Sequence, residues 1–496
     1  MTSTITGKQL IDAGWPEGPL IGTGLQAARK LAFAGQEDGA ILTQLGQVAA
    51  DPAAYVDDAV LGGVAAGWMA IQAPKPAHSH QLRSQPVPYV TWGANLIDPN
   101  AMKQIERAAR LPIAKQAAVM PDAHVGYGLP IGGVLATEGA VIPYAVGVDI
   151  ACRMRLSVCP VSPHLLDQKR GLFENALIEQ TRFGPGVGWA RDERPDHAVL
   201  ESKDWAAIPF VNRLKQKAWE QLGSSGGGNH FVEWGILTVG EEDAKTAVFD
   251  LASGKYIALL SHSGSRGLGA SIAKEYTTIA QHKHAKLDKK YRELAWLSLD
   301  SEAGQEYWLA MNLAGRYAAA NHAVIHERVL AAAGLEPIAS VENHHNFAWR
   351  EQLADGSDVI VHRKGATPAG EDVLGVIPGS MGDPAYVVSG LGQAEAINSA
   401  SHGAGRKYGR SEAFRVLEPK RWQEYLRKRN VTLIGGSLDE SPQAYKKIDD
   451  VMAAQQDLVA VVAQFMPRIV RMAEAKQPKW RRDKQRRKKQ KRRRSR

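Results

Sequence analysis

The chain has 496 residues and a net charge of +9, and 44% of its residues are hydrophobic. This length allows a large core or more than one domain, and no uninterrupted apolar run is long enough to span a bilayer. Two cysteines exclude a disulfide-stapled scaffold. The first residues lack the basic start and apolar core of a signal peptide, so we expect a cytoplasmic protein with reduced cysteines and no membrane partner.

The positive charge is concentrated at the C-terminus. Residues 477–496 contain thirteen Lys or Arg and a single Asp, a net charge of +12, so the remaining 476 residues carry a net charge of −3. A block of like charge is typical of a disordered tail that binds nucleic acid non-specifically. We therefore expect contact with RNA or the ribosome through this tail, and the alternative is that it serves only solubility.

Residues 1–75 predict a small helical extension without catalytic chemistry. Helices are expected over 23–33 and 57–71, and the Asp51-Pro52 step should end a further helix between them. The proline-rich segment 73–80 is typical of a linker. The expected organisation is therefore an extension over 1–75, a catalytic domain over 76–476 and a basic disordered tail over 477–496.

From Val87 onward the pattern changes to short strands, glycine-rich loops and long helices. This mixture, without βαβ alternation, predicts an α+β fold. The segment 142–158 predicts a buried strand, and its part from Cys152 to Val158 alternates apolar and polar side chains as a half-buried strand does. Helices are expected over 165–181, 208–222, 272–297, 306–333 and 445–475.

The stretch from Met120 to Val134 crowds proline and glycine around Asp122 and His124. Such a density of turn-forming residues is typical of a loop that is shaped for a ligand. A tight structural turn explains the same residues equally well, and this stretch alone does not decide between the two.

Asp149 and Cys152 lie three residues apart at the predicted end of a strand or in a turn, so both side chains can reach one ion. A thiolate combined with oxygen and imidazole ligands suits Zn, Mn, Fe or Co. The alternative is a cysteine that is simply buried. Cys159 is expected to face away from Cys152 and to lie in the core.

Three further stretches add histidines to this set. Asn229 and His230 follow three consecutive glycines, which cost conformational entropy and are hard to explain by folding alone. His262 follows an apolar strand, in a loop of Ser, Arg and Gly that indicates a phosphate or metal site. His344 and His345 are adjacent and point in different directions, so at most one of them is expected to be a primary ligand.

The basic pair at 363–364, the segment Pro378-Gly-Ser-Met-Gly and the segment His402-Gly-Ala-Gly indicate a nucleotide or polyphosphate cradle. They combine cationic side chains, exposed backbone N–H groups and a histidine that could attack phosphorus or bind a metal. The alternative is a helix N-terminus capped by Ser399 or Ser401, with His402 as a bystander. Each stretch alone is weak, whereas the combination favours a catalytic site.

Taken together, these motifs resemble the RtcB family of GTP-dependent RNA ligases over about residues 87–475, including Glu440-Ser-Pro-Gln-Ala-Tyr near the end. The resemblance implies a single α+β domain of packed sheets flanked by helices, two Mn²⁺ ions and GTP. It further implies that RNA 3′-phosphate or 2′,3′-cyclic phosphate ends are joined to 5′-hydroxyl ends through a guanylylated histidine, in tRNA splicing or RNA repair.

The resemblance also assigns residues. Asp149, Cys152 and His230 match the ligands of one manganese, and Cys152 matches a bridge to a second manganese that His262 and His345 complete. His402 matches the histidine that receives GMP, and His344 would lie outside the ligand set. The implied GTP-binding residues are Asn229, His230, Phe231, Val232, Glu233, His345, Asn346, Pro378, Gly379, Ser380, Met381, His402, Gly403, Ala404 and Gly405.

Two departures from the family pattern concern the nucleotide. Ala385 stands where the family often has serine, and the Lys-Gly that ends the family is absent, so Arg471 or Lys476 would have to substitute for that lysine. Two other functions remain open. One is a metal-dependent RNA phosphohydrolase or cyclic phosphodiesterase that does not need His402. The other is a non-catalytic RNA-binding homologue, against which the intact ligand set argues.

Overall fold

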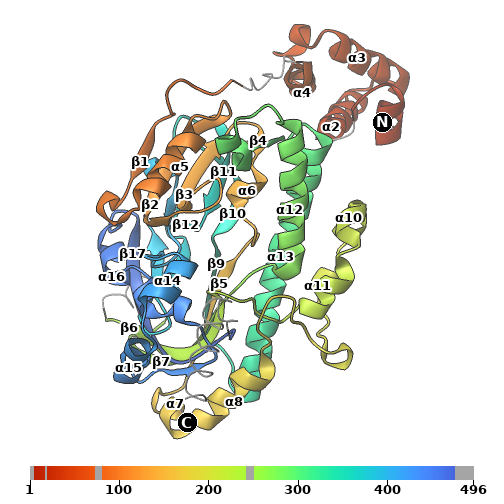
Figure 1. Cartoon of the computed structure of the whole chain (residues 1–496). Helices are drawn as coiled ribbons and strands as arrows, with labels where there is room; N and C mark the ends of the chain where they lie inside the picture. The colour runs from red at the N-terminus through yellow and green to blue at the C-terminus, as the bar shows by residue number, and fades with distance from the viewer. Residues whose placement is uncertain (1–4, 17–18, 73–80, 242–250, 475–496) are drawn as a thin grey trace, which may run out of the picture. The chain divides into compact units, whose positions relative to one another are not determined.

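The computed structural model describes residues 5–16, 19–72, 81–241 and 251–474 (Figure 1). The chain divides into two compact units, residues 1–79 and residues 80–496. The expected linker over 73–80 and the basic tail lie outside the described residues. Among the described helices, none combines the length and the apolar character that a membrane crossing requires.

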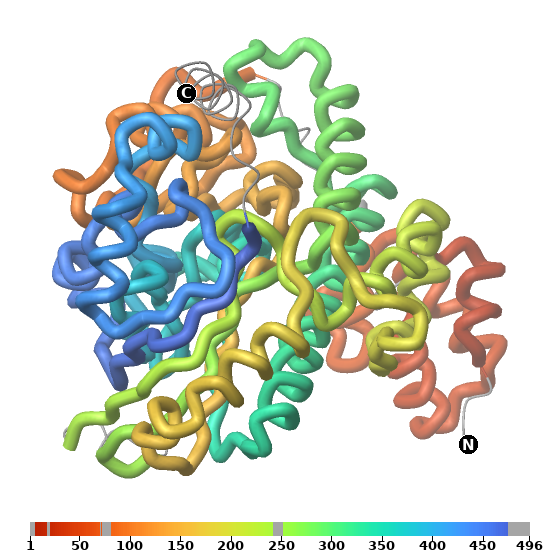
Figure 2. Tube along the Cα trace, turned by 60° about the horizontal axis from the view of Figure 1, so that its bottom comes forward, coloured from red at the N-terminus to blue at the C-terminus, as the bar shows by residue number. Residues whose placement is uncertain are grey.

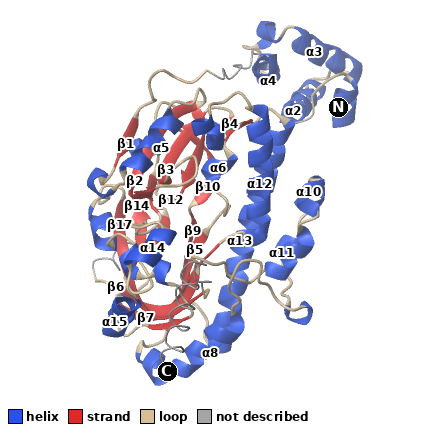
Figure 3. Ribbon diagram, in the orientation of Figure 1, coloured by secondary structure: helices blue, strands red, loops and turns tan. Residues whose placement is uncertain are grey.

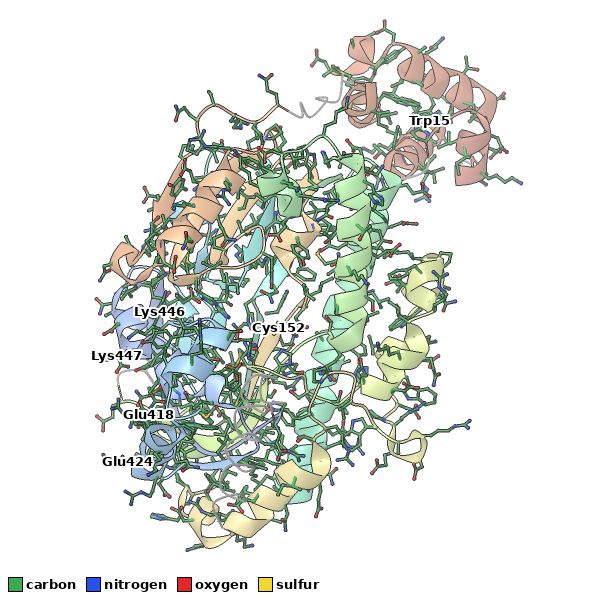
Figure 4. The ribbon with its side chains drawn as sticks, in the orientation of Figure 1. Trp15, Cys152, Glu418, Glu424, Lys446 and Lys447 are labelled. Atoms are coloured by element: carbon green, nitrogen blue, oxygen red, sulfur yellow. The ribbon has the colours of Figure 1, made fainter. Side chains whose placement is uncertain are left out.

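The N-terminal unit is helical, as the sequence predicted. Its core includes an edge-to-face pair of Trp15, labelled in Figure 4, and Trp68, with ring centroids 5.5 Å apart. The second helix begins at Pro19 and not at Thr23, because proline fits the first turn of a helix. The unit contains α1 (Gly7–Asp12), α2 (Pro19–Phe33), α3 (Asp38–Ala50), a 3₁₀ turn (Pro52–Tyr55) and α4 (Gly62–Gln72).

Two sheets form the framework of the larger unit, which confirms the α+β fold. Figure 3 shows them bordered by long helices on one side and by short helices on the other. A five-stranded sheet has the order β1 (Tyr89–Thr91), β2 (Ala114–His124), β3 (Ile131–Thr137), β11 (Asp358–Lys364), β10 (Asn346–Gln352). An eight-stranded sheet has the order β13 (Leu374–Pro378), β14 (Ala385–Gly390), β17 (Val459–Met472), β6 (Phe231–Val239), β7 (Gly254–Ser263), β5 (Arg153–Cys159), β9 (Ala339–His344), with β16 (Thr432–Ile434) also paired to β17. Two small sheets pair β12 (Ala366–Pro368) with β15 (Ser399–Ser401), and β4 (Ala140–Val141) with β8 (Leu297–Ser298).

Two long helices, α12 (Arg266–Lys283) and α13 (Glu302–Ala333), pack against each other beside the sheets (Figure 1). The helix expected over 306–333 is confirmed and begins one turn earlier, because the Ser301 hydroxyl accepts a hydrogen bond from the Gly304 N–H. The helix expected over 272–297 is displaced, since α12 ends at Lys283 and a 3₁₀ turn (Lys289–Leu294) follows.

The helices expected over 165–181 and 208–222 are each confirmed as two shorter helices. These are α7 (His164–Gln168) with α8 (Arg170–Gln180), and α10 (Pro209–Asn212) with α11 (Lys215–Gln221). The remaining helices are α5 (Pro99–Ala109), α6 (Pro143–Val146), α9 (Asp204–Ala207), α14 (Arg410–Val416), α15 (Pro419–Lys428) and α16 (Ile448–Ala453).

The helix expected over 445–475 is wrong. Only α16 is helical there, and residues 459–472 form β17, which pairs with β6, β14 and β16. Figure 2 shows this dark-blue strand running beside the lime-coloured β6. The segment is rich in Val and Ile, which favour strands, and it packs apolar side chains on both faces of the sheet, so its hydrophobic pattern also fits a helix.

The strand expected over 142–158 is correct only in its second half. Pro143 opens the short helix α6, and Gly147, with a φ of 106°, turns the chain before β5 begins at Arg153. β5 lies between β7 and β9 and is buried on both faces, not half-buried as the alternation predicted. Polar side chains on β5 have charged or hydrogen-bonding partners inside the protein. Arg155 pairs with Glu342, for example.

Candidate metal and nucleotide site

The five predicted metal ligands lie at the ends of neighbouring strands of the eight-stranded sheet: His262 is on β7, and the other four flank β5, β6 and β9. β6, β7, β5 and β9 are neighbours in this order, and each runs antiparallel to the next. The first residues of β6 and β5 therefore lie beside the last residues of β7 and β9, along the edge of the sheet that these strand ends form. Figure 4 labels Cys152, which immediately precedes β5. The ligands gather at this edge as two overlapping sets, Asp149 with Cys152 and His230, and Cys152 with His262 and His345.

The distances fit two cations that share Cys152. Its Sγ lies 3.1 Å from Nε2 of His262 and 3.5 Å from Nε2 of His230. Nε2 of His230 lies 2.9 Å from a carboxylate oxygen of Asp149, and Nε2 of His262 lies 3.2 Å from Nε2 of His345. Within each set all ligand atoms lie within 4.8 Å of one another, which one ion can span.

Hydrogen bonds orient the second ligand set. Nδ1 of His262 lies 3.1 Å from the carbonyl oxygen of Asn229, which can only accept, so the ring proton is on Nδ1 and the Nε2 lone pair faces Cys152. Nδ1 of His345 is buried and has no hydrogen-bond partner among the described residues. A thiolate, imidazoles and a carboxylate together suit a transition-metal pair, so the residues present fit the implied ions.

Burial sets the protonation of these ligands. It lowers the pKa of His262 to about 3 and the pKa of His345 well below its ordinary value, so both rings are neutral and able to bind a metal. Burial, together with the charge of Asp149, raises the pKa of the Cys152 thiol well above its ordinary value. A cation is therefore needed to hold Cys152 as a thiolate. Burial is the largest single influence on Asp149 and acts against its ionisation, but the hydrogen bond and charge of His230, with smaller contributions from Cys152 and Arg266, together outweigh it, so the pKa is lowered.

His402 follows β15 in a tight turn, so the helix N-terminus considered as an alternative is wrong. Its Nδ1 lies 2.6 Å from a carboxylate oxygen of Asp122, and its backbone N–H donates to the same oxygen at 3.2 Å. Asp122 is completely buried on β2. Because the carboxylate accepts the Nδ1 proton, Nε2 carries the free lone pair. The His402 ring centroid is 4.8 Å from that of His345.

Asp122 is held firmly in place. Lys446, labelled in Figure 4, donates from Nζ to the carbonyl oxygens of Pro121 and Ala123 at 2.9 and 2.8 Å, one on each side of Asp122. The turn after His402 comes so close to this strand that a Cβ on Gly405 would lie 2.1 Å from the Asp122 carbonyl oxygen. The loop expected over 120–134 is therefore confined to residues 125–130, because Asp122 and His124 lie on β2, where Asp122 contacts His402.

The two predicted nucleotide turns lie side by side. The Ala404 N–H donates to the Pro378 carbonyl oxygen at 3.0 Å, which joins the turn after β13 to the turn that carries His402. Asn346 connects the metal ligands to the neighbouring strand, because its side chain donates to the Asp149 carbonyl at 3.2 Å and accepts from the Gly365 N–H at 2.8 Å. The Pro378 and His402 turns are thus in direct contact, and Asn346 links the Asp149 loop to the segment that follows β11.

Phe231 and Glu233 project from the same face of β6. The Phe231 ring lies 5.6 Å from the His262 ring, and Glu233 is buried, which raises its pKa well above the ordinary carboxyl value. Val232 lies between them on the opposite face, where it packs with Trp234. Only the backbone of Val232 can therefore contribute on the Phe231 and Glu233 side of the strand.

Arg471 does not replace the missing family lysine. It pairs in register with Val232, and its guanidinium donates to the Leu177 carbonyl of α8, across the sheet from Glu233. The residue that pairs with Phe231 and packs on its face is Met472. Lys476 lies outside the described residues. The face next to Glu233 therefore carries the apolar side chain of Met472, and Arg471 adds no charge there.

The basic pair at 363–364 is structural and does not form the expected cradle. Arg363 is 1% exposed, pairs with both carboxylate oxygens of Glu351 at 2.5 and 2.9 Å, and stacks over Trp349. Lys364 donates from Nζ to the carbonyl oxygens of Tyr127 and Tyr144. Cationic side chains at the site come instead from elsewhere in the chain.

Two arginines lie beside the metal ligands, and sequence reasoning missed one of them, Arg410. Arg266, at the start of α12, donates to the Gly184 carbonyl at 2.9 Å, and its charge contributes to the low pKa of Asp149. Arg410 is paired with Glu440 and lies against Gly228, where a Cβ would meet its guanidinium at 2.8 Å. Arg266 is the arginine of the Ser-, Arg- and Gly-containing loop that the sequence indicates as a phosphate or metal site, whereas Arg410 has no local sequence signal.

A family model described as "tRNA-splicing ligase RtcB" matches residues 104–473 of the chain. The chain belongs to the RtcB family. It is 32% identical to the RNA-splicing ligase RtcB of Escherichia coli (strain K12), over 77% of this chain and 96% of that protein. It is 33% identical to the tRNA-splicing ligase RtcB of Thermococcus kodakarensis, over 76% and 90%, and 33% identical to the RNA-splicing ligase RtcB of Mycobacterium tuberculosis, over 73% and 98%. The resemblance inferred from the motifs is confirmed.

Proposed function

We propose that this RtcB-family protein is a GTP- and Mn²⁺-dependent RNA ligase that joins 3′-phosphate or 2′,3′-cyclic phosphate ends to 5′-hydroxyl ends. The observation that carries the proposal is the position of His402. Its Nδ1 is bound to Asp122, which leaves Nε2 as a nucleophile, and its ring lies next to His345 of the candidate metal pair. A hydrolase that uses only metal-activated water has no need of this arrangement.

In the first step, Nε2 of His402 attacks the α-phosphorus of GTP, an N–P bond forms and pyrophosphate leaves. The carboxylate of Asp122 fixes the tautomer and stabilises the positive charge that develops on the ring. Asp149, Cys152, His230, His262 and His345 would hold the two Mn²⁺ ions. These ions supply neutralisation of charge on the phosphoryl oxygens.

In the second step, an oxygen of the RNA 3′-phosphate attacks the phosphorus on His402, the N–P bond breaks and GMP moves to the RNA end. The 5′-hydroxyl of the second RNA end then attacks the 3′-phosphorus and releases GMP. A 2′,3′-cyclic phosphate is first opened by water. The phosphate in the new linkage therefore comes from the 3′ end.

Glu233 supports guanine as the base of the bound nucleotide. Burial favours the neutral form of Glu233, and the N1–H and 2-amino donors that guanine presents together would stabilise the ionised carboxylate, which can accept both hydrogen bonds. Met472 offers apolar contact and no charge on the face of Phe231. We infer that recognition of the base depends more on Glu233 than in relatives that end in Lys-Gly.

The test offers two oligonucleotides in both end configurations, with GTP and Mn²⁺. We expect joining only of 3′-phosphate or cyclic phosphate ends to 5′-hydroxyl ends, with a label on the 3′-phosphate retained in the linkage. Joining of 3′-hydroxyl to 5′-phosphate ends contradicts the proposal. Opening of the cyclic phosphate without ligation favours the phosphodiesterase, and RNA binding without either reaction favours the non-catalytic homologue.

The physiological setting follows from the same proposal. The substrate is RNA with broken ends, as in tRNA splicing or RNA repair, and the reaction takes place in the cytoplasm. Residues 76–476 form the catalytic domain, and the tail over 477–496 adds non-specific contact with RNA or the ribosome.

A further inference from the structure

The loop that follows β2 is braced from several sides. Gln104 of α5 donates to the Gly126 carbonyl oxygen at 2.6 Å and accepts from the Gly126 N–H at 3.0 Å. The carboxylate of Glu293 accepts from the Gly128 N–H at 2.7 Å. These bonds hold the backbone on both sides of Tyr127, so the position of this residue is fixed.

Despite this fixed backbone, the Tyr127 side chain is 64% exposed. Its ring lies 6.0 Å from that of Tyr144, at an angle of 59° between the planes. Lys364 connects the two residues, because its Nζ donates to the carbonyl oxygens of both. Val125 and Val148, each adjacent in sequence to these segments, are exposed as well. The result is a rigid, exposed aromatic surface.

This surface belongs to segments that carry the site. Tyr127 lies five residues after Asp122, and Tyr144 lies five residues before Asp149. Lys364 precedes Gly365, where a Cβ would lie 3.1 Å from Cε1 of His402. Lys364 therefore links the backbones of Tyr127 and Tyr144 to the end of β11, which is followed by the residue that contacts His402.

We infer that Tyr127, supported by Tyr144, is a stacking platform for the terminal nucleobase of the RNA strand that ends in the 3′-phosphate. The inference rests on the proposed ligase function and adds the recognition of a nucleobase to it. Proteins bind single-stranded RNA by stacking bases on exposed aromatic side chains, and every base offers a flat face.

The position of the platform favours the 3′ end. The strand that ends in the 3′-phosphate must approach the phosphorus on His402 directly, and the platform is fixed through Asp122 and Lys364 to the segments that position His402. Stacking on Tyr127 would hold the last base while its phosphate reaches the metal ligands. Such contact does not depend on the identity of the base, so it suits an enzyme that joins many sequences.

The experiment measures binding of fluorescent 3′-phosphate RNA in Mn²⁺ by anisotropy, without GTP, for the parent, Tyr127→Ala and Tyr127→Phe. We expect Tyr127→Ala to bind on the order of tenfold more weakly and Tyr127→Phe to resemble the parent. An abasic 3′-terminal nucleotide should weaken binding to the parent similarly but should not weaken binding to Tyr127→Ala further. Tyr55→Ala, in the N-terminal unit, is the control and should not change binding.

Self-guanylylation with labelled GTP is measured on the same proteins and is expected to be equal in all of them. Equal RNA binding by the parent and Tyr127→Ala overturns the platform, as does an abasic effect that persists in Tyr127→Ala. A raised KM for GTP in Tyr127→Ala would assign the surface to the nucleotide instead. If instead the loss of affinity in Tyr127→Ala matched that caused by an abasic 5′-terminal nucleotide on a 5′-hydroxyl RNA, the platform would belong to the other strand. If the parent protein showed no guanylylation, the proposed function would be contradicted. The RNA-binding data would still show whether Tyr127 stacks on the terminal base.

Discussion

Nδ1 of His402 lies 2.6 Å from a carboxylate oxygen of Asp122, although 280 residues separate the two in the chain. Asp122 belongs to the five-stranded sheet, and the candidate metal ligands lie at the edge of the eight-stranded sheet. The proposed reaction therefore takes place where the two sheets meet, with the nucleophile oriented from one side and the ions held from the other.

Replacing His402 by Ala should abolish covalent attachment of GMP and leave the fold and metal content unchanged, because His402 contributes the nucleophile and is not among the metal ligands. Intact-protein mass spectrometry after incubation with GTP and Mn²⁺ should show an adduct only in the parent. An adduct of equal yield in the variant would place the nucleophile elsewhere.

Asp122→Asn should slow guanylylation by about 10²–10⁴-fold, because the neutral amide neither fixes the Nδ1 proton nor stabilises the charged ring. Single-turnover rates with labelled GTP measure the effect, and metal analysis should show that both ions are retained. Asp355→Asn, in an exposed turn, is the matched control. A rate within threefold of the parent would exclude Asp122 as a positioning residue.

Cys152→Ala should lose both metals, whereas His262→Ala should lose mainly one, because Cys152 belongs to both ligand sets and His262 to one. Metal analysis of the purified variants measures this difference. Cys159→Ala is the control, since Cys159 is buried in the core beside Trp234, and its metal content should equal that of the parent. Equal manganese content in Cys152→Ala and the parent would refute the bridge.

His362 should make the fold sensitive to acid. Its Nε2 accepts from the Ile142 N–H at 2.9 Å, and burial lowers its pKa from 6.5 to about 4. Above pH 6.5 the ring is neutral in both states. As the pH falls from 6.5 to about 4, the unfolded chain takes up the proton first, so the free energy of unfolding decreases.

Nδ1 of His362 donates to the Leu135 carbonyl oxygen at 3.2 Å, so the ring makes two hydrogen bonds. His362→Gln should remove this loss of stability in acid, because the glutamine amide can accept from Ile142 and donate to Leu135 and does not titrate. The decrease in unfolding free energy between pH 7 and pH 4 should be smaller in the variant by about 3 kcal/mol. Denaturant titrations of both proteins at several pH values provide the measurement. Parallel pH profiles would mean that His362 does not limit acid stability.

Removing residues 479–496 should weaken RNA binding and leave self-guanylylation nearly unchanged. The removed segment carries most of the positive charge of the chain, and phosphate contacts make affinity fall with salt. The dependence of log Kd on log salt should therefore be steeper for the full-length protein. Identical slopes would mean that the tail does not contact phosphate.

The clustering of the five candidate ligands could be predicted because their motifs resemble those of the RtcB family, and each residue lies in a short stretch whose local structure the fold preserves. Asp149 and Cys152 are close in sequence, and His262 ends an apolar strand, so their positions follow from short-range geometry. The partner of His402 could not be predicted in this way. Its spacing from Asp122 has no meaning until two sheets have formed, and a buried aspartate gives no periodic signal.

Other errors arose where burial removes the usual pattern. β17 packs on both faces, so its continuous hydrophobic run did not distinguish strand from helix. Arg363 lies in a motif that is typical of phosphate-binding sites, yet it forms an ion pair with Glu351 inside the protein. The direction of Arg471 depends on strand register, which one sequence alone does not reveal.

The position of β17 has a consequence for biosynthesis. It is the last described strand, and in the sheet it lies between β14 and β6, so it joins a C-terminal hairpin to the strands that bear the metal ligands. During translation, every other strand of the sheet leaves the ribosome before the strand that connects these two parts. The eight-stranded sheet therefore cannot be completed until residue 472 has emerged, and until then β6 and β14 each present an unpaired edge. A polypeptide that terminates even twenty residues before that point would contain His402 and all five ligands. It would lack β17, so no strand would join β14 to β6.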